Sequence, residues 1–98
     1  MGYDARELGI RPEKQTFFVN QGVGFVVSSN GSGNGTIKIY GVDQNLVRSM
    51  SFNYTPGQSI VRWDGRNDQG EPVHADVYWV VIKNDEFGEQ KIYVAAIR

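Results

Sequence analysis

The chain has 98 residues, a formal net charge of −1, 40% hydrophobic residues and no cysteine, which describes one globular domain without disulfides, thiolate metal ligands or a cysteine nucleophile. Because no basic excess is present to neutralise phosphates, binding to nucleic acid is not expected. The longest apolar run, residues 77–82, is too short to cross a bilayer, so membrane insertion is not expected either.

Residues 1–14 alternate charge and polarity and are expected to form a linker, and residues 15–98 a single β domain. Within that domain, runs of β-branched and aromatic residues are each bounded by Gly, Asn, Asp or Pro, as is typical of strands separated by turns. The pattern predicts seven strands, at residues 15–20, 23–29, 35–41, 46–53, 58–63, 76–84 and 90–97. Strands this short at this spacing indicate a β-sandwich or barrel.

The predicted strand at residues 76–84 is apolar on both faces. Tyr78, Val80 and Ile82 share one face, and the residues that alternate with them share the other. Such a strand is expected to be central in its sheet, with its second face covered.

The stretch of residues 63–73, followed by Val77 and Tyr78, resembles the FlgD-like immunoglobulin-type domain, a family named after the flagellar hook-capping protein. Two earlier segments, residues 37–40 and the Leu-Val-Arg run at 46–48, match the same pattern, as does the closing run 91–98. The resemblance covers roughly residues 22–98. It departs at Asp76 and Asn45, where the family usually has glycine; both tolerate left-handed backbone better than most residues.

The resemblance implies an immunoglobulin-like sandwich of about seven antiparallel strands, used in secreted and cell-surface bacterial proteins as a non-catalytic, extracytoplasmic module that anchors, spaces or connects parts of an assembly. The hook-capping protein carries flanking strands that we do not find here, so the accessory use is expected before a role as hook-cap scaffold. The structural motif is expected to comprise Trp63, Asp64, Gly65, Arg66, Gly70, Val73 and Tyr78.

The loop after Trp63 is rich in oxygen donors, but its spacing does not fit a calcium loop. Arg66 occupies the third position from Asp64, and Gln69 stands where the glycine of an EF-hand loop is required. A structural interpretation is therefore preferred: Trp63 fills the core, Asp64 caps backbone amides, and two glycines permit the turns. The single histidine, His74, has no recognisable catalytic or metal-binding partner, so we expect no enzyme activity, no metal and no cofactor.

The second face of strand 76–84 suggests an interaction patch. Two interpretations remain open: residues 1–20 cover it, or it docks an adjacent domain, a protein subunit, a second copy or, less favoured, a glycan. The residues of this expected patch are Tyr40, Val77, Trp79, Val81 and Tyr93.

Three further hypotheses are weaker. A carbohydrate-binding module would use exposed rings such as Tyr54, Trp79 and Tyr93. Residues 1–20 would either complete the domain's own sheet or add a strand to a neighbouring copy. Three Asn-x-Ser/Thr acceptor patterns begin at Asn30, Asn34 and Asn53, although coincidence is the favoured explanation.

Overall fold

A computed structural model describes residues 9–98, which form eight β-strands and no helix. Accordingly, no helix that could span a membrane occurs in this part of the chain. The strands are β1 (Gly9–Pro12), β2 (Thr16–Phe18), β3 (Val23–Ser29), β4 (Gly33–Tyr40), β5 (Leu46–Tyr54), β6 (Gly57–Trp63), β7 (Asp76–Asn84) and β8 (Gly88–Ile97).

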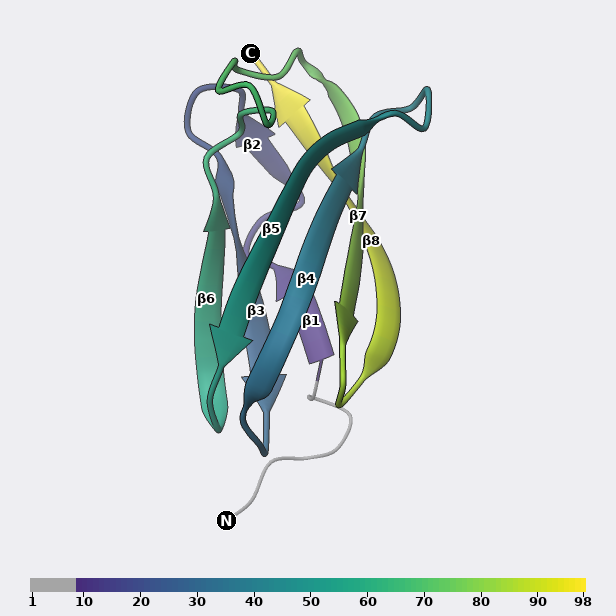
Figure 1. The fold of residues 1–98 in the computed structure, drawn as a ribbon. Coiled ribbons are helices and arrows are strands. Elements are labelled where there is room, and N and C mark those ends of the chain that lie inside the picture. Colours follow the sequence, from purple (N-terminus) through teal and green to yellow (C-terminus); the bar gives the residue numbers. More distant parts are fainter. Residues whose placement is uncertain (1–8) are drawn as a thin grey trace.

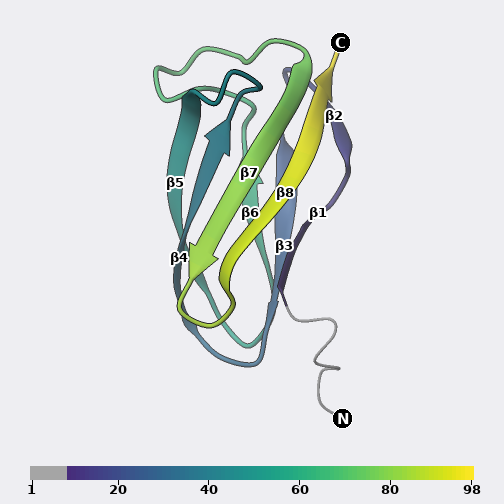
Figure 2. The ribbon, with the colours of Figure 1, turned by 90° about the vertical axis from the view of Figure 1, so that its right-hand side faces the viewer.

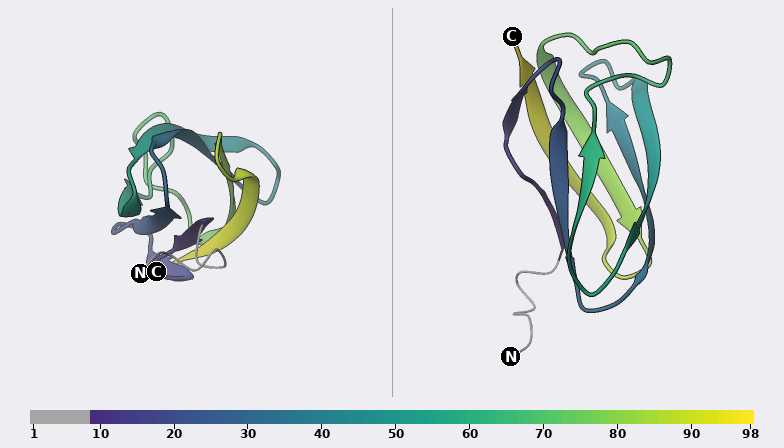
Figure 3. Two further views of the ribbon diagram at one scale, coloured as in Figure 1. Left: turned by 90° about the horizontal axis from the view of Figure 1, so that it is seen from below. Right: turned by 90° about the vertical axis from the view of Figure 1, so that its left-hand side faces the viewer.

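The strands form two sheets that face each other (Figures 1 and 2). One sheet has three strands in the order β1-β3-β6, and the other has five in the order β2-β8-β7-β4-β5. Seen end-on, the sheets curve toward each other around the core (Figure 3). This architecture confirms the predicted all-β, immunoglobulin-like sandwich, with one strand more than the seven expected.

The extra strand arises because the N-terminal part of the described chain changes sheets. β1 pairs with β3 in the antiparallel sense, and after a short crossing β2 pairs with β8 in the parallel sense. Residues 9–12, assigned above to the linker, therefore belong to the sandwich, and Ile10 is buried in its core. A four-residue strand gives too short an alternation to be recognised in the sequence. Residues 1–8 of the expected linker lie outside the described residues.

The core follows from the alternation of side chains along the strands. β3 is buried along its whole length, and β7 lies between β8 and β4 with Tyr78, Val80 and Ile82 turned inward. The central position predicted for this strand is thus observed. Burying these aliphatic and aromatic side chains supplies the main stabilisation of a domain without disulfides.

The strands run along the long direction of the molecule, so the loops gather at its two ends. β1 begins at one end, where Gly9 pairs with Ser28 near the end of β3, and the β3–β4, β5–β6 and β7–β8 connections lie at the same end. Arg98 lies at the other end with the long β6–β7 loop, as Figures 1 and 3 show.

Candidate functional site: an exposed aromatic sheet face

Trp63, at the end of β6, has no solvent exposure. Its ring packs edge to face against Phe17 of β2 and Tyr78 of β7, with centroid distances of 5.3 and 5.8 Å. The indole N–H donates to the carbonyl oxygen of Arg66 at 2.9 Å, so the one polar atom of the ring is satisfied. Trp63 therefore joins both sheets and the loop that follows it.

The β6–β7 loop is ordered by hydrogen bonds to its own backbone. The Asp64 carboxylate accepts from the amide of Arg66 at 3.0 Å, and the Arg66 guanidinium donates to the carbonyl oxygen of Gly70 at 2.7 Å. Gly65 and Gly70 have φ of 77° and 86°, a region that side chains disfavour. Val73 is buried beneath the loop. These contacts hold the loop folded onto the core.

The side chain of Arg48, on β5, also forms hydrogen bonds with this loop. Its guanidinium donates to the carbonyl oxygens of Arg66 and Asn67, both at 3.3 Å, and to the Asp64 carboxylate at 3.4 Å. Two of the segments that carry the family resemblance, Leu-Val-Arg and the stretch from Trp63, are therefore in direct contact. This contact holds the loop against the free edge of β5, where the amide of Asp68 donates to the carbonyl oxygen of Val47.

Replacing Arg48 by methionine, which keeps the apolar stem, is expected to lower the free energy of unfolding by about 1–3 kcal/mol, because the loop's carbonyl oxygens lose a charged donor. Urea denaturation followed by circular dichroism measures the loss. Lys38→Met on the exposed face of β4 is the control, with an expected change within about 0.5 kcal/mol. Equal losses in the two variants would contradict the role of Arg48.

Oxygen atoms of the loop side chains accept hydrogen bonds from the loop's own backbone. The Asn67 side-chain oxygen accepts from the amides of Gln69 and Glu71, at 3.0 and 2.9 Å. Within residues 9–98, no three His, Asp or Glu side chains gather as metal ligands. His74 has an exposed side chain, and its carbonyl oxygen accepts from the Tyr78 hydroxyl at 2.7 Å.

Two buried tyrosines have perturbed pKa values. Burial, and then the negative charge of Glu86, raises the pKa of Tyr54 above its usual 10.0. Burial, and then the charge of Asp76, raises the pKa of Tyr78. Well below pH 10.0 both phenols are neutral in the folded and unfolded states. As the pH rises further, the unfolded state ionises first, so stability is lost.

The domain is therefore expected to lose stability above pH 10.0, and Tyr54→Phe is expected to lose less over the same range because one such phenol is gone. Urea midpoints between pH 9 and pH 11 measure the slope. Tyr93→Phe, at a half-exposed ring, controls for removing a tyrosine. Identical slopes for wild type and Tyr54→Phe would refute the assignment.

The expected interaction patch forms a continuous surface on the outer face of the five-stranded sheet, the sheet nearest the viewer in Figure 2. Tyr40, Trp79 and Tyr93 are cross-strand partners on β4, β7 and β8, so their rings form one row across the strands. Trp79 and Tyr93 are 48% and 47% exposed and lie edge to face at 5.7 Å. Val77 and Val81 flank Trp79 along β7. We call this surface, Tyr40, Val77, Trp79, Val81 and Tyr93, the aromatic face.

Of the two interpretations left open above, the described residues favour an uncovered face. β1 lies in the opposite sheet, and β2 extends the five-stranded sheet at its edge instead of crossing it. β2 also pairs with β8 of the same chain, so these residues complete the domain's own sheet. A shallow groove of about 540 Å³ runs between the face and the β4–β5 turn, lined by Tyr40, Gly41, Val42, Gln44, Trp79, Val81 and Lys91.

Two lysines missed by the sequence analysis border the aromatic face. Lys38 of β4 and Lys91 of β8 are the cross-strand partners of Val81, one on each side. The sequence contained the information needed to find them. Each lysine stands two residues from an aromatic residue of the face along its own strand, and residues two apart in a strand lie on the same side of the sheet.

One of the rings proposed for carbohydrate binding, Tyr54, is buried, so that part of the hypothesis is wrong. Tyr54 is 3% exposed and packs against Phe52 and Phe87 in the core, where it cannot contact a ligand. The expected strand ended at residue 53, whereas β5 continues to Tyr54, in phase with the buried Phe52.

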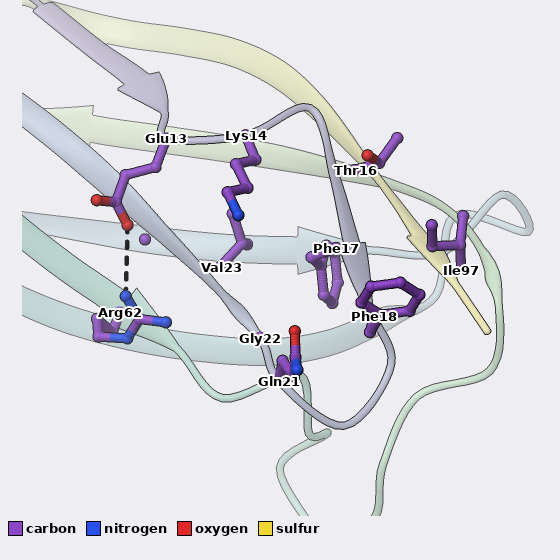
Figure 4. Close-up of a pocket in the computed structure, with 11 residues that line it drawn as sticks. Glu13, Lys14, Thr16, Phe17, Phe18, Gln21, Gly22, Val23, Arg62 and Ile97 are labelled. Carbon is purple, nitrogen blue, oxygen red and sulfur yellow. Dashed lines mark hydrogen bonds and ion pairs between the residues drawn. The ribbon is translucent and has the colours of Figure 1, made fainter.

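A second hollow, of about 470 Å³, opens where the chain crosses from β1 to β2 (Figure 4). The ion pair between Glu13 and Arg62, 3.3 Å apart, borders it on one side, and the rings of Phe17 and Phe18 border it on the other. Among its lining residues Glu13 is the one carboxylate, and it is already paired. The hollow thus offers no acid–base couple.

Comparisons with known proteins bear on the fold. No protein-family model matches the chain, and no curated protein is significantly similar to it in sequence. Among solved structures, it is similar to part of PorZ, described as an essential bacterial surface component of the type-IX secretion system of Porphyromonas gingivalis, with a TM-score of 0.56 and 18% identity over 92% of this chain. β-Glucosidases from Erythrobacter marinus and Listeria innocua give TM-scores of 0.46 and 0.44 at 11% and 13% identity, over 90% and 92% of this chain.

The chain spans 12% of the PorZ chain and 15% and 16% of the two glucosidase chains. The likeness to PorZ shows that this β-sandwich occurs as a part of a much longer protein.

Proposed function

We propose that this domain is a non-catalytic interaction module of an extracytoplasmic protein or surface assembly, and that it belongs to the FlgD-like immunoglobulin-type domains. The observation that carries the proposal is the aromatic face: five apolar or aromatic side chains from three strands share one outer sheet surface. Soluble proteins rarely expose a large contiguous apolar surface, and such a surface, where it occurs, often marks an interaction site.

Features elsewhere in the molecule support the interpretation that the domain is a scaffold for that face. The motif from Trp63 onward is used in internal hydrogen bonds and packing. Gly9 and Arg98 lie at opposite ends of the sandwich, an arrangement that suits a module placed in line between other parts of a protein. The extracytoplasmic location rests on the family resemblance, and the fold likeness to a bacterial surface component agrees with it.

Two kinds of ligand are compatible with such a face. A neighbouring domain, a protein subunit or a second copy would bury the aromatic rings, as interface cores do. A carbohydrate-binding role is the second candidate, favoured by the row of rings across three strands.

Trp79→Ala is expected to lower the thermal midpoint much less than Trp63→Ala does while abolishing binding through the face, because the ring is half exposed and contacts Tyr93 on the surface. Differential scanning calorimetry measures the first effect. Sedimentation velocity over a range of concentrations measures self-association, and titration with polysaccharides measures the second candidate. Ile60→Ala, at a 58% exposed side chain on the opposite sheet, is the matched control.

A large drop in the thermal midpoint of Trp79→Ala would return this residue to the core and contradict the proposal. Unchanged binding in Trp79→Ala, or an equal loss in Ile60→Ala, would place the interaction elsewhere on the domain.

A further inference from the structure

We propose that the aromatic face binds an acidic polysaccharide that lies across the strands, with its sugar rings on the aromatic row and its carboxylates over Lys38 and Lys91. This inference rests on the proposed function and names the ligand class for the same surface.

The first argument is the geometry of two parallel rows. Tyr40, Trp79 and Tyr93 occupy one register level across β4, β7 and β8. Lys38, Val81 and Lys91 occupy the level two residues away on the same strands. Two residues of a strand span about 7 Å, so the ammonium row runs alongside the aromatic row. A sugar chain on the rings would therefore place its equatorial substituents over the lysines.

The second argument is charge. Within residues 9–98, neither Lys38 nor Lys91 forms an ion pair with a carboxylate. Lys83, the lysine of β7, is instead paired with Glu89 at 3.5 Å. Adjacent strands lie about 4.8 Å apart, so Lys38 and Lys91, separated by β7, stand about 10 Å apart at the backbone. Two such cations on either side of an apolar side chain suit a ligand with regularly spaced negative charges.

The third argument separates a glycan from a protein partner. Lysine is depleted in the cores of protein interfaces, because burying an unpaired ammonium is unfavourable. A second copy packed so that its Lys38 and Lys91 lie opposite these would add repulsion. An acidic polysaccharide stays hydrated and supplies a carboxylate for each ammonium while its apolar ring faces contact the aromatic residues.

The fourth argument is the polar surface beside the rings. The groove at this face is lined by Gln44 and Lys91 together with Tyr40 and Trp79. A few placed polar groups among aromatic walls are the common composition of small-ligand sites, since the polar groups orient the ligand. Hydroxyl groups of a sugar would find both donors and acceptors there.

The test uses three carboxylate polysaccharides (polygalacturonate, alginate and hyaluronate), and fully methyl-esterified polygalacturonate as a neutral probe with the same backbone. Isothermal titration calorimetry measures affinity. We expect at least one acidic polymer to bind, with an affinity that falls as sodium chloride is raised from 50 to 500 mM. If the bound polymer is polygalacturonate, its ester is expected to bind about tenfold more weakly or worse.

Variants locate the site. Trp79→Ala is expected to weaken binding by about tenfold or more, and the pair Lys38→Gln with Lys91→Gln by a similar factor. Ile60→Ala and Lys83→Gln are matched controls, with changes expected below about twofold. In the wild type, ligand is expected to change tryptophan fluorescence, since Trp63 is buried and Trp79 is exposed.

Several results would overturn the inference. These are no binding of any acidic polymer, equal binding of polygalacturonate and its ester, or binding that is unaffected by the two lysine substitutions. Self-association that depends on Trp79, without polysaccharide binding, would reject the acidic ligand and keep the proposed interaction module. A Trp79→Ala variant that unfolds would reject both.

Discussion

Replacing Trp63 by alanine is expected to lower the free energy of unfolding by about 3–5 kcal/mol, the usual loss for a large aromatic residue in a packed core. Trp63 is fully buried, contacts the rings of Phe17 and Tyr78, and donates to the carbonyl oxygen of Arg66. Its removal leaves a cavity between the sheets and takes away one of the two donors to the Arg66 carbonyl oxygen, the other being Arg48. Because domains of this size are stable by about 5–15 kcal/mol, much of the total would be lost.

Urea denaturation followed by circular dichroism measures this loss, and two variants show its cause. Trp63→Phe keeps an aromatic ring but loses the indole N–H, so its loss is expected to be smaller. Trp79→Ala removes the other tryptophan, from the outer face, and is expected to lose less, about 1–2 kcal/mol, because its ring is half exposed and contacts Tyr93. A Trp63→Ala variant as stable as Trp79→Ala would show that the indole does not fill the core.

Gly22→Ala is expected to destabilise the domain by about 2–5 kcal/mol through two separate effects. Gly22 has φ of 73°, a conformation that is unfavourable by about 1–2 kcal/mol for a residue with a Cβ atom. A Cβ atom there would also overlap the carbonyl oxygen of Trp63 and lie 2.9 Å from the Cα atom of Asp64. Moving this backbone adds about 1–3 kcal/mol, the usual effect of overpacking.

Gly88 provides the control, because it isolates the first effect. Its φ is 74°, and a Cβ atom would meet nothing within 4 Å. Gly88→Ala is therefore expected to lose only the conformational part, about 1–2 kcal/mol. Chemical denaturation of the two variants under one set of conditions gives the difference. If both lose the same amount, the close approach of Gly22 to Trp63 has no energetic consequence.

Much of the fold could be predicted because it is encoded locally. The expected strands 23–29 and 76–84 coincide with β3 and β7, where runs of β-branched and aromatic residues are bordered by turn residues. The side-chain period of two residues also placed Trp79 on the face opposite Tyr78. β1 was missed because four residues ending in Pro12 carry too little pattern.

The sites depended on information that a single strand does not carry. Alternation shows which face a residue occupies, but the level at which it meets its neighbours is set by pairing between distant strands. The sequence placed Tyr40, Trp79 and Tyr93 in one expected patch, but their alignment in a single row follows only from the register of β4, β7 and β8. The same applies to Arg48, whose partners stand 16 to 19 residues further along the chain.

The parallel pairing of β2 with β8 has a mechanical consequence. A tension applied between Gly9 and Arg98, at opposite ends of the sandwich, would draw these two strands in opposite directions along their length (Figure 1). The bonds from the Ala95 amide to the Gln15 carbonyl and from the Val19 amide to the Ile97 carbonyl would then bear the load together. Bonds sheared together must break nearly at once, so the pairing raises the barrier to forced unfolding, a process that the unfolding rate governs.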